Sequence, residues 1–295
     1  MKKYAIGVDV GGSHVCSSVI EITSGKICTD PVTTPIDSKD TASGIIGGWA
    51  SNILETASLL GEPVSDVGMA LPGPFDYERG ISKIHGVDKF EEIYGLNVGE
   101  ALKSVIQPKI GPVEFRFVND ASAFALGECL GGAARDADKV VAITLGTGVG
   151  SGFVDSKRLV VSGDRVPANG WVYCIPFEGD IADAAFSTRW FVRRYKELTG
   201  IDVSGAKDVV DRYDSDVAAR RLLDEYGGRL ADFVSPLARR FGAGKLVLGG
   251  NISRAYPLFR KSLEEGLARN CCDVTVCVSE LMDRAAMMGA ASLFL

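Results

Sequence analysis

Two short glycine-rich segments of this chain each follow a run of β-forming residues. The first reads Asp9-Val10-Gly11-Gly12-Ser13 and the second Gly146-Thr147-Gly148-Val149-Gly150. Glycines at a hairpin tip let backbone N–H groups approach an anion without a Cβ in the way. An acid at the end of the preceding strand can hold a hydrated Mg²⁺ that bridges phosphates. Either segment alone reads equally well as a plain hairpin turn, but two at matched positions favour a phosphate clamp.

Asn119-Asp120 is a third candidate, between the β-type run 115–118 and a helical run. Asp at such a place most often caps a helix N-terminus. The alternative is a carboxylate at the C-terminal end of a strand, which accepts a proton from a substrate hydroxyl as that hydroxyl attacks phosphorus.

The second glycine segment is no Walker A loop, because it lacks the Gly-Lys-Ser/Thr ending and a strand follows it.

Two further turns end strands and have simple structural readings as well. Gly249-Gly250-Asn251 closes the apolar run 246–248, and ligands of α/β folds collect at such strand ends. It is either a plain strand-to-helix turn or a flat surface for a base or ribose. Pro72-Gly73-Pro74 ends the run 64–71 and is either a rigid turn or a backbone wall against which a small polar ligand lies.

The elements that must position these segments follow one pattern in each half of the chain. Residues 4–10, 14–22, 26–32, 64–71 and 115–118 read as strands, and 38–60, 98–106 and 121–130 as helices. Further strands are expected at 139–145, 151–154, 158–161, 246–248 and 273–278, and a last helix at 282–295. Strand–glycine turn–strand occurs at 4–22 and again at 139–154, a weak internal repeat that places two glycine tips at a shared cleft.

Composition excludes several classes of function. The 295 residues predict two domains, and the net charge of −6 argues against a nucleic-acid surface built on bulk basicity. Seven Cys and two His, with no C-x-x-C, supply neither a zinc site nor a disulfide framework. The N-terminus does not read as a signal peptide, and no apolar run reaches the roughly 20 residues that span a bilayer. We therefore expect a cytoplasmic protein.

Taken in order, these segments resemble the ROK family. That family contains sugar kinases and sugar-responsive repressors with an α/β, two-domain actin-like ATPase (ribonuclease H-like) fold and an interdomain cleft. The resemblance covers essentially the whole chain and implies an N-terminal domain of 1–118 plus 282–295 and a C-terminal domain of 119–281. The segments that carry it are Asp9-x-Gly11-Gly12-Ser13, Leu71–Pro74, Asn119–Ala123 with Gly127-Glu128, Leu145–Gly150 and Gly249–Asn251.

The resemblance also implies roles for these residues. Asp120 would be the general base for a sugar hydroxyl, and Gly73 and Asn119 would touch the sugar together with it. Asp9 would lie near Mg²⁺, directly or through water. ATP and its phosphates would be bound by Asp9, Gly11, Gly12, Ser13, Gly146, Thr147, Gly148, Gly150, Gly249, Gly250 and Asn251.

The sequence departs from the family at the sugar and zinc positions. Where the family has G-E-x-G-H and then a Cys-rich zinc loop, this chain reads Pro167-Ala168-Asn169-Gly170-Trp171, and no zinc cysteines follow. Asp183 replaces a sugar-binding Glu. Trp171 is a candidate to stack on a sugar face, and His85 and Lys89 lie where the family has another sugar-contacting loop. Plain packing or solvated loop positions are the alternatives for these residues. Because the polar contacts of the family's Glu and His are lost at Ala168 and Trp171, glucose specificity does not carry over.

We therefore expect an ATP-dependent kinase, without zinc, that phosphorylates a hydroxyl of a hexose or N-acetylhexosamine. The small-molecule sugar is its expected partner, with no nucleic acid and no membrane, and the family's habit implies a homodimer. A repressor is disfavoured, because the first strand begins at Tyr4 and leaves no room for a helix-turn-helix domain. A catalytically silent sugar or nucleotide sensor is the alternative, motivated by the missing Glu, His and zinc loop.

Overall fold

The computed structural model describes residues 3–295, which form two compact units. Unit 1 comprises the chain up to Gly132 together with Asp283–Leu295, and unit 2 comprises Ala133–Met282. The units divide after Gly132 rather than after residue 118, where the sequence analysis places the boundary. The reason is packing, because helix α3 (Asp120–Gly131) lies against helix α9 (Ala285–Ala291) and belongs with unit 1.

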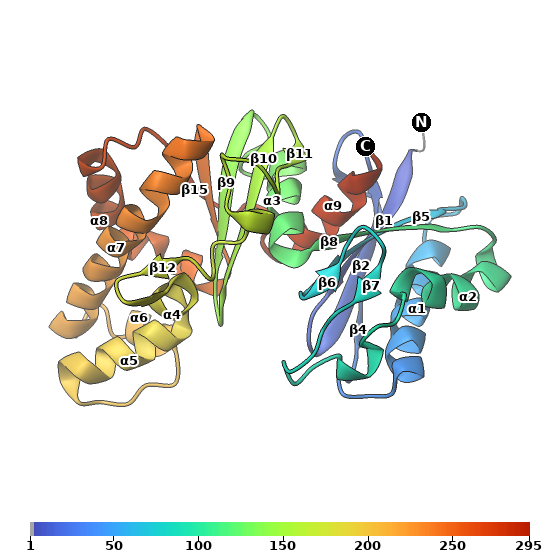
Figure 1. The fold of residues 1–295 in the computed structure, drawn as a ribbon, viewed down its shortest axis with the longest axis horizontal. Helices are drawn as coiled ribbons and strands as arrows, with labels where there is room; N and C mark the ends of the chain where they lie inside the picture. The colour runs from blue at the N-terminus through green and yellow to red at the C-terminus, as the bar shows by residue number, and fades with distance from the viewer. Residues whose placement is uncertain (1–2) are drawn as a thin grey trace. The chain divides into compact units, whose positions relative to one another are not determined.

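A mixed sheet forms the centre of unit 1 (Figure 1). Its order is β3-β2-β1-β5-β8, and β4 also pairs with β2. β1 is antiparallel to β2 and parallel to β5, which is parallel to β8. The strands are β1 (Tyr4–Val10), β2 (His14–Glu21), β3 (Lys26–Ile27), β4 (Val32–Pro35), β5 (Asp66–Leu71) and β8 (Glu114–Asn119).

The third strand, expected over 26–32, is two strands in the structure. β3 pairs with the end of β2 and β4 with its beginning. Between them, Thr29 bonds to β2 in place of the regular backbone ladder. Its Oγ1 accepts a hydrogen bond from the Val19 N–H at 3.0 Å, and its carbonyl accepts one from the Ser18 Oγ at 2.8 Å. Pro31 follows and has no N–H to give to a sheet.

The alternation of side chains along β1 decides which residues face the site. Ile6 and Val8 point into the core formed with α1 (Ala42–Ser58) and α2 (Val98–Ile110). Successive side chains of a strand point to opposite faces, so Gly7 and Asp9 lie on the other face, which α9 covers. The remaining elements of unit 1 are β6 (Phe75–Asp76), β7 (Ile81–Ser82), η1 (Glu91–Ile93), η4 (Met282–Arg284, which begins in unit 2) and η5 (Ser292–Phe294).

Helix α9 lies very close to the sheet of unit 1. A Cβ at Gly7 would overlap the carbonyl oxygen of Met287, and one at Gly68 would overlap that of Ala290. The last helix, expected over 282–295, is in the structure a seven-residue α-helix flanked by two short 3₁₀-helices. Its position brings Asp283 to the face of β1 that carries Asp9.

Unit 2 contains a second mixed sheet, in the order β11-β10-β9-β14-β15. β9 is antiparallel to β10 and parallel to β14, which is parallel to β15. Val141, Ile143 and Leu145 of β9 point into a core that the helices of this unit complete. The strands are β9 (Lys139–Leu145), β10 (Val149–Asp155), β11 (Arg158–Leu159), β12 (Pro176–Phe177), β13 (Asp180–Ile181), β14 (Lys245–Gly249) and β15 (Thr275–Val278).

Helices cover the sheet of unit 2 (Figure 1). They are η2 (Ala168–Gly170), α4 (Ala182–Phe186), α5 (Thr188–Thr199), α6 (Ala206–Val210), α7 (Val217–Phe241), η3 (Asn251–Ala255) and α8 (Tyr256–Arg269). The longest of them, α7, has one apolar face and one charged face. Within residues 3–295 no helix combines the length and the apolar character that a membrane crossing requires.

Candidate active site

The first glycine segment is the tip of the β1–β2 hairpin. The Gly11 N–H donates to the His14 carbonyl at 3.0 Å and closes the turn. The Ser13 carbonyl accepts from the Ile36 N–H at 3.0 Å, which ties the tip to the chain that follows β4. Gly12 and Ser13 are exposed. The tip is thus a braced turn that presents backbone to solvent.

Three carboxylates lie near this tip. Asp9 pairs with Cys16 in the β1–β2 register, one residue before the turn. Burial raises the pKa of its carboxyl to about 7, and the negative charges of Asp120 and Asp283 add to the effect. Like charges that repel one another in a desolvated place favour the neutral acid. A cation nearby would therefore stabilise the ionised forms of these three acids.

Asn119 and Asp120 are placed differently at the start of α3. Asn119 is the N-cap of α3, because its Oδ1 accepts from the N–H groups of Ala121 at 3.1 Å and Ser122 at 3.3 Å. Asp120 is the first helical residue, and its Oδ1 accepts from the Ala121 N–H at 2.8 Å and from the Asn119 Nδ2 at 2.9 Å. Oδ2 accepts from no other residue within 3–295, so one carboxylate oxygen is fixed and the other is available.

The environment of Asp120 makes it a stronger base than an ordinary Asp. The side chain retains accessible surface, yet enough protein surrounds it that desolvation raises the pKa of the carboxyl. The hydrogen bonds from Ala121 and Asn119 and the charge of Lys89 act in the opposite direction and only reduce the rise. A carboxylate with a raised pKa takes up a hydroxyl proton more readily.

Tyr77 is a site residue that the sequence analysis missed. Its hydroxyl donates to the Leu71 carbonyl at 3.1 Å and accepts from the Asn119 Nδ2 at 3.4 Å. A Cβ at Gly73 would lie 3.4 Å from the same hydroxyl. Tyr77 thereby joins the end of β5, the Pro72–Pro74 turn and Asn119, and burial raises the pKa of its phenol. A lone Tyr in a loop carries no spacing signal by which sequence reasoning could find it.

The donor set of unit 1 fits a hydrated Mg²⁺ better than a directly ligated metal. Carboxylate oxygens are the ligands that Mg²⁺ takes from proteins, usually one or two of them, with waters completing the shell. Among residues 3–295 no group of three or more His, Cys, Asp or Glu side chains is close enough to hold a metal ion. Desolvation makes the ionised form of Asp9 unfavourable, and a hydrated Mg²⁺ bound through a water molecule would offset this.

The second glycine segment is the tip of the β9–β10 hairpin, and it is braced from outside. The Gly146 N–H donates to the Gly148 carbonyl at 3.0 Å, and the Gly146 carbonyl accepts from both the N–H and the Oγ1 of Thr188 at 2.8 and 3.1 Å. Asp183 Oδ1 accepts from the Val149 N–H at 2.8 Å, and its Oδ2 pairs with Arg189. Asp183, predicted to touch the sugar, thus holds the second tip.

Gly250 lies directly against this second tip. Its φ of +77° is a left-handed value that side chains avoid, and a Cβ would overlap the backbone of Leu145. Its carbonyl accepts from the Ser253 N–H at 3.1 Å and Oγ at 2.7 Å, which orders the turn into η3. Unit 2 therefore brings Gly146–Gly150, Asp183 and Gly249–Asn251 together.

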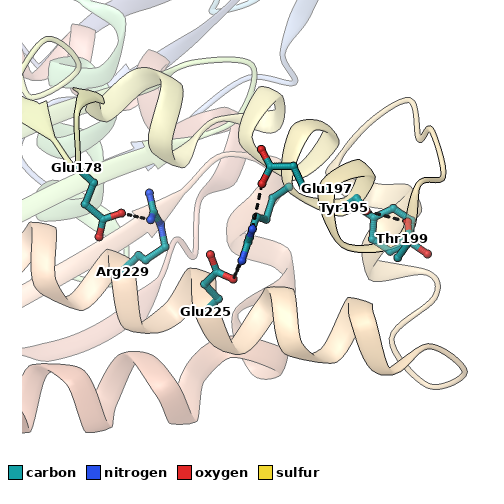
Figure 2. Close-up of polar contacts among 7 residues, drawn as sticks. Glu178, Tyr195, Glu197, Thr199, Glu225 and Arg229 are labelled. Carbon is teal, nitrogen blue, oxygen red and sulfur yellow. Dashed lines mark hydrogen bonds and ion pairs between the residues drawn. The ribbon is translucent and has the colours of Figure 1, made fainter.

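Ion pairs join the β12–β13 hairpin, which precedes Asp183, and α5 to helix α7. Figure 2 shows Glu178, in the turn of the β12–β13 hairpin, pointing toward Arg229 of α7, with which it pairs. The Arg229 guanidinium lies 5.3 Å from the Phe177 ring centroid and 5.4 Å from that of Trp190. Glu225 of α7 in turn accepts from Arg194 of α5 at 2.9 Å. The Glu178–Arg229 pair and the Arg229 guanidinium beside Phe177 thus join the hairpin that leads into α4 to α7, and the Glu225–Arg194 pair joins α7 to α5.

Two residues that the sequence predicts to bind sugar show no hydrogen bond or ring contact with the other predicted site residues within 3–295. The side chain of His85 is 78% exposed and contacts its own loop, with Nδ1 3.1 Å from Glu91 Oε2. The ring of Trp171 has Tyr173 as its aromatic neighbour, at 6.1 Å. Within residues 3–295 neither side chain makes a hydrogen bond or ring contact with another predicted site residue. Their assignment to a sugar stays a prediction.

The chain belongs to the ROK family, whose model matches residues 5–295. It is 29% identical over 315 residues to a glucokinase of Thermotoga maritima (98% of this chain, 96% of that protein). It is 26% identical over 312 residues to an N-acetyl-D-glucosamine kinase of Mannheimia succiniciproducens (98% of each). A ROK family glucokinase of Streptomyces griseus, solved with glucose and AMPPNP, matches with a TM-score of 0.73 at 22% identity (98% of each chain). The fold is that of the two-domain actin-like kinases of this family, and the chain is a ROK family sugar kinase.

Proposed function

We propose that this ROK family sugar kinase transfers the γ-phosphoryl group of ATP to a hydroxyl of a hexose or N-acetylhexosamine, with Asp120 as general base. The observation that carries the proposal is the geometry of Asp120. One oxygen is fixed by Ala121 and Asn119, the other is available, and desolvation raises the pKa of the carboxyl. A base oriented in this way can take the hydroxyl proton as the O–P bond forms.

Asn119, Tyr77 and Gly73 support a sugar next to Asp120. They follow the ends of β5 and β8 and lie together around the Tyr77 hydroxyl. The relatives named above act on glucose and on N-acetyl-D-glucosamine, which supports this substrate class. The Glu and His of the family's sugar motif are Ala168 and Trp171 here. Because a site discriminates hydroxyls through hydrogen bonds, we expect a substrate preference that differs from theirs.

The two glycine tips support nucleotide binding. Each presents backbone at a hairpin turn, the arrangement that binds phosphate oxygens, and Gly250 leaves a flat surface beside the second tip. The AMPPNP complex of the Streptomyces griseus glucokinase supports ATP as the donor. Mg²⁺ would bind near Asp9 through its coordinated waters and would neutralise phosphate charge.

We further propose that the protein is cytoplasmic.

The test is a coupled ADP-release assay on a panel of hexoses and N-acetylhexosamines. Wild type should turn over at least one sugar, and Asp120→Asn should reduce kcat by about 10³-fold with normal folding. Substitution of an exposed carboxylate of unit 1, Asp30→Asn, is the matched control and should retain full activity. Equal turnover by wild type and Asp120→Asn would remove Asp120 from this role. Sugar binding by calorimetry without ADP release from any sugar would favour the silent sensor instead.

A further inference from the structure

Lys89 lies over the first glycine tip although it comes from a distant loop. A Cβ built on Gly12 would be 3.8 Å from the Lys89 Cδ, so the aliphatic part of the lysine side chain passes directly beside the tip. The family resemblance predicts that Lys89 lies in a loop that contacts sugar. Its position beside Gly12 and near Asp120 points to a different partner, between the phosphate-binding turn and the base.

The loop around Lys89 is held rigidly. Glu91 Oε1 accepts from the N–H groups of Val87 at 2.8 Å and Asp88 at 3.2 Å. The Phe90 side chain is fully buried against Trp49, at 5.4 Å between ring centroids. The carboxylate of Asp88 pairs with Lys39 at 2.9 Å. These contacts hold the backbone on both sides of Lys89, so the point from which its side chain leaves the loop is set by the fold.

The backbone on both sides of Lys89 has an unfavourable conformation, which these contacts maintain. Asp88 and Phe90 both take left-handed φ values, 60° and 57°. A non-glycine residue in that region costs on the order of 1 kcal/mol. Strain of this kind persists only where surrounding contacts enforce it, and it gathers at functional sites. The two strained residues flank Lys89 on either side.

The ammonium of Lys89 lies near enough to Asp120 for its charge to act on that carboxyl. Within residues 3–295 it forms no hydrogen bond or close ion pair, in contrast to Lys39 and Lys83 of the same region. Its charge reaches Asp120 and lowers the pKa of that carboxyl. A half-buried lysine without a protein partner, beside a turn of exposed backbone, is arranged for an anionic ligand.

We propose that the Lys89 ammonium contacts the transferring phosphoryl group, between the Gly11–Ser13 tip and Asp120, and stabilises its charge during transfer. This role rests on the proposed kinase function. In the step, the sugar oxygen forms a bond to Pγ, the bond from Pγ to the β–γ bridging oxygen breaks, and ADP leaves with that electron pair. The hydroxyl proton goes to Asp120, and Lys89 keeps its protons. Charge on the equatorial phosphoryl oxygens is what such a cation stabilises.

The test compares Lys89→Met, Lys89→Arg and Lys83→Met. Lys83 is an exposed lysine of the same loop region whose ammonium is 3.5 Å from Asp76, so it controls for loss of a surface charge. Lys89→Met should reduce kcat by about 10²-fold or more, with the KM for sugar unchanged. Lys89→Arg should recover part of the loss, and Lys83→Met should behave as wild type. All three should unfold at the wild-type temperature.

A binding measurement separates this proposal from the proposed function. Calorimetry should show AMPPNP binding weakened about tenfold in Lys89→Met while ADP binding is unchanged, and this result needs no sugar turnover. A kcat within threefold of wild type, or equal AMPPNP affinity, would overturn the assignment. A loss confined to the KM for sugar would make Lys89 a sugar contact. If wild type binds AMPPNP but turns over no sugar, the kinase proposal fails while the AMPPNP difference still decides the role of Lys89.

Discussion

The two units share one sheet plan but equip their hairpin tips differently. The orders β3-β2-β1-β5-β8 and β11-β10-β9-β14-β15 match strand for strand, with the same parallel and antiparallel pairs. The tip of unit 1 lies near three acids, and the pKa of two of them is raised. The tip of unit 2 is braced by an acid whose oxygens are already paired. The comparison teaches that similar turns can present reactive side chains in one unit and chiefly backbone in the other.

The sharpest way to test this contrast is to neutralise one acid in each unit. Asp9→Asn should lower kcat by about 10²–10³-fold, about 3–4 kcal/mol of barrier, because it removes the carboxylate that would orient the hydrated Mg²⁺. Steady-state kinetics over a range of Mg²⁺ concentrations measures the loss, and Asp183→Asn is the counterpart in unit 2. Equal losses of kcat in both variants would erase the distinction between the units.

The backbone role of unit 2 is tested at Gly250. Gly250→Ala should destabilise the protein by about 2–4 kcal/mol, because its φ is left-handed and the new Cβ overlaps Leu145. Gly244→Ala is the control in the same unit, since a Cβ there has no neighbour within 4 Å. Urea unfolding measures both. A stability of Gly250→Ala within 0.5 kcal/mol of wild type, a margin of about the scatter of neutral substitutions, would contradict the close packing.

The raised pKa in unit 1 predicts a pH dependence of stability. Asp9 titrates near pH 7 when folded and near its ordinary value of 3.8 when unfolded, so the folded state binds the extra proton between these values. Stability should therefore fall as pH rises from about 4 to 7, by about 2 kcal/mol after allowance for partial exposure. Unfolding without nucleotide or Mg²⁺, at pH 5 and pH 8, should show a smaller fall for Asp9→Asn. Parallel profiles would mean that Asp9 ionises without penalty.

The smallest effect is expected at Asp183. Asp183→Asn retains an oxygen for the Val149 N–H but loses the pair with Arg189, which loosens the second tip by about 1 kcal/mol. The KM for ATP should rise about fivefold while the KM for sugar stays unchanged. The reverse pattern would restore the sugar contact that the sequence predicts.

Sequence reasoning located the parts that local patterns encode. β1 and β9 agree with their expected bounds, because both are runs rich in β-forming residues that end at a glycine turn. Asp120 at the start of α3 and the glycine segments at the two hairpin turns also lie where the sequence predicts them, while their roles stay predictions. Tyr77, Asp283 and the actual position of Lys89 were not, since each reaches the site from a separate segment whose own pattern is that of an ordinary loop. The third strand is split where Thr29 and Pro31 interrupt the backbone ladder, which periodicity does not register.

The close approach of α9 to the first sheet has a consequence for how the protein is made. Residues 133–282 contain all the strands of unit 2 and leave the ribosome as a contiguous block. Residues 1–132 of unit 1 are translated first, yet α9, which covers the face of their sheet that carries Asp9, is synthesised only after unit 2. The face of unit 1 that holds the acids is therefore completed only after the strands of unit 2 have been translated.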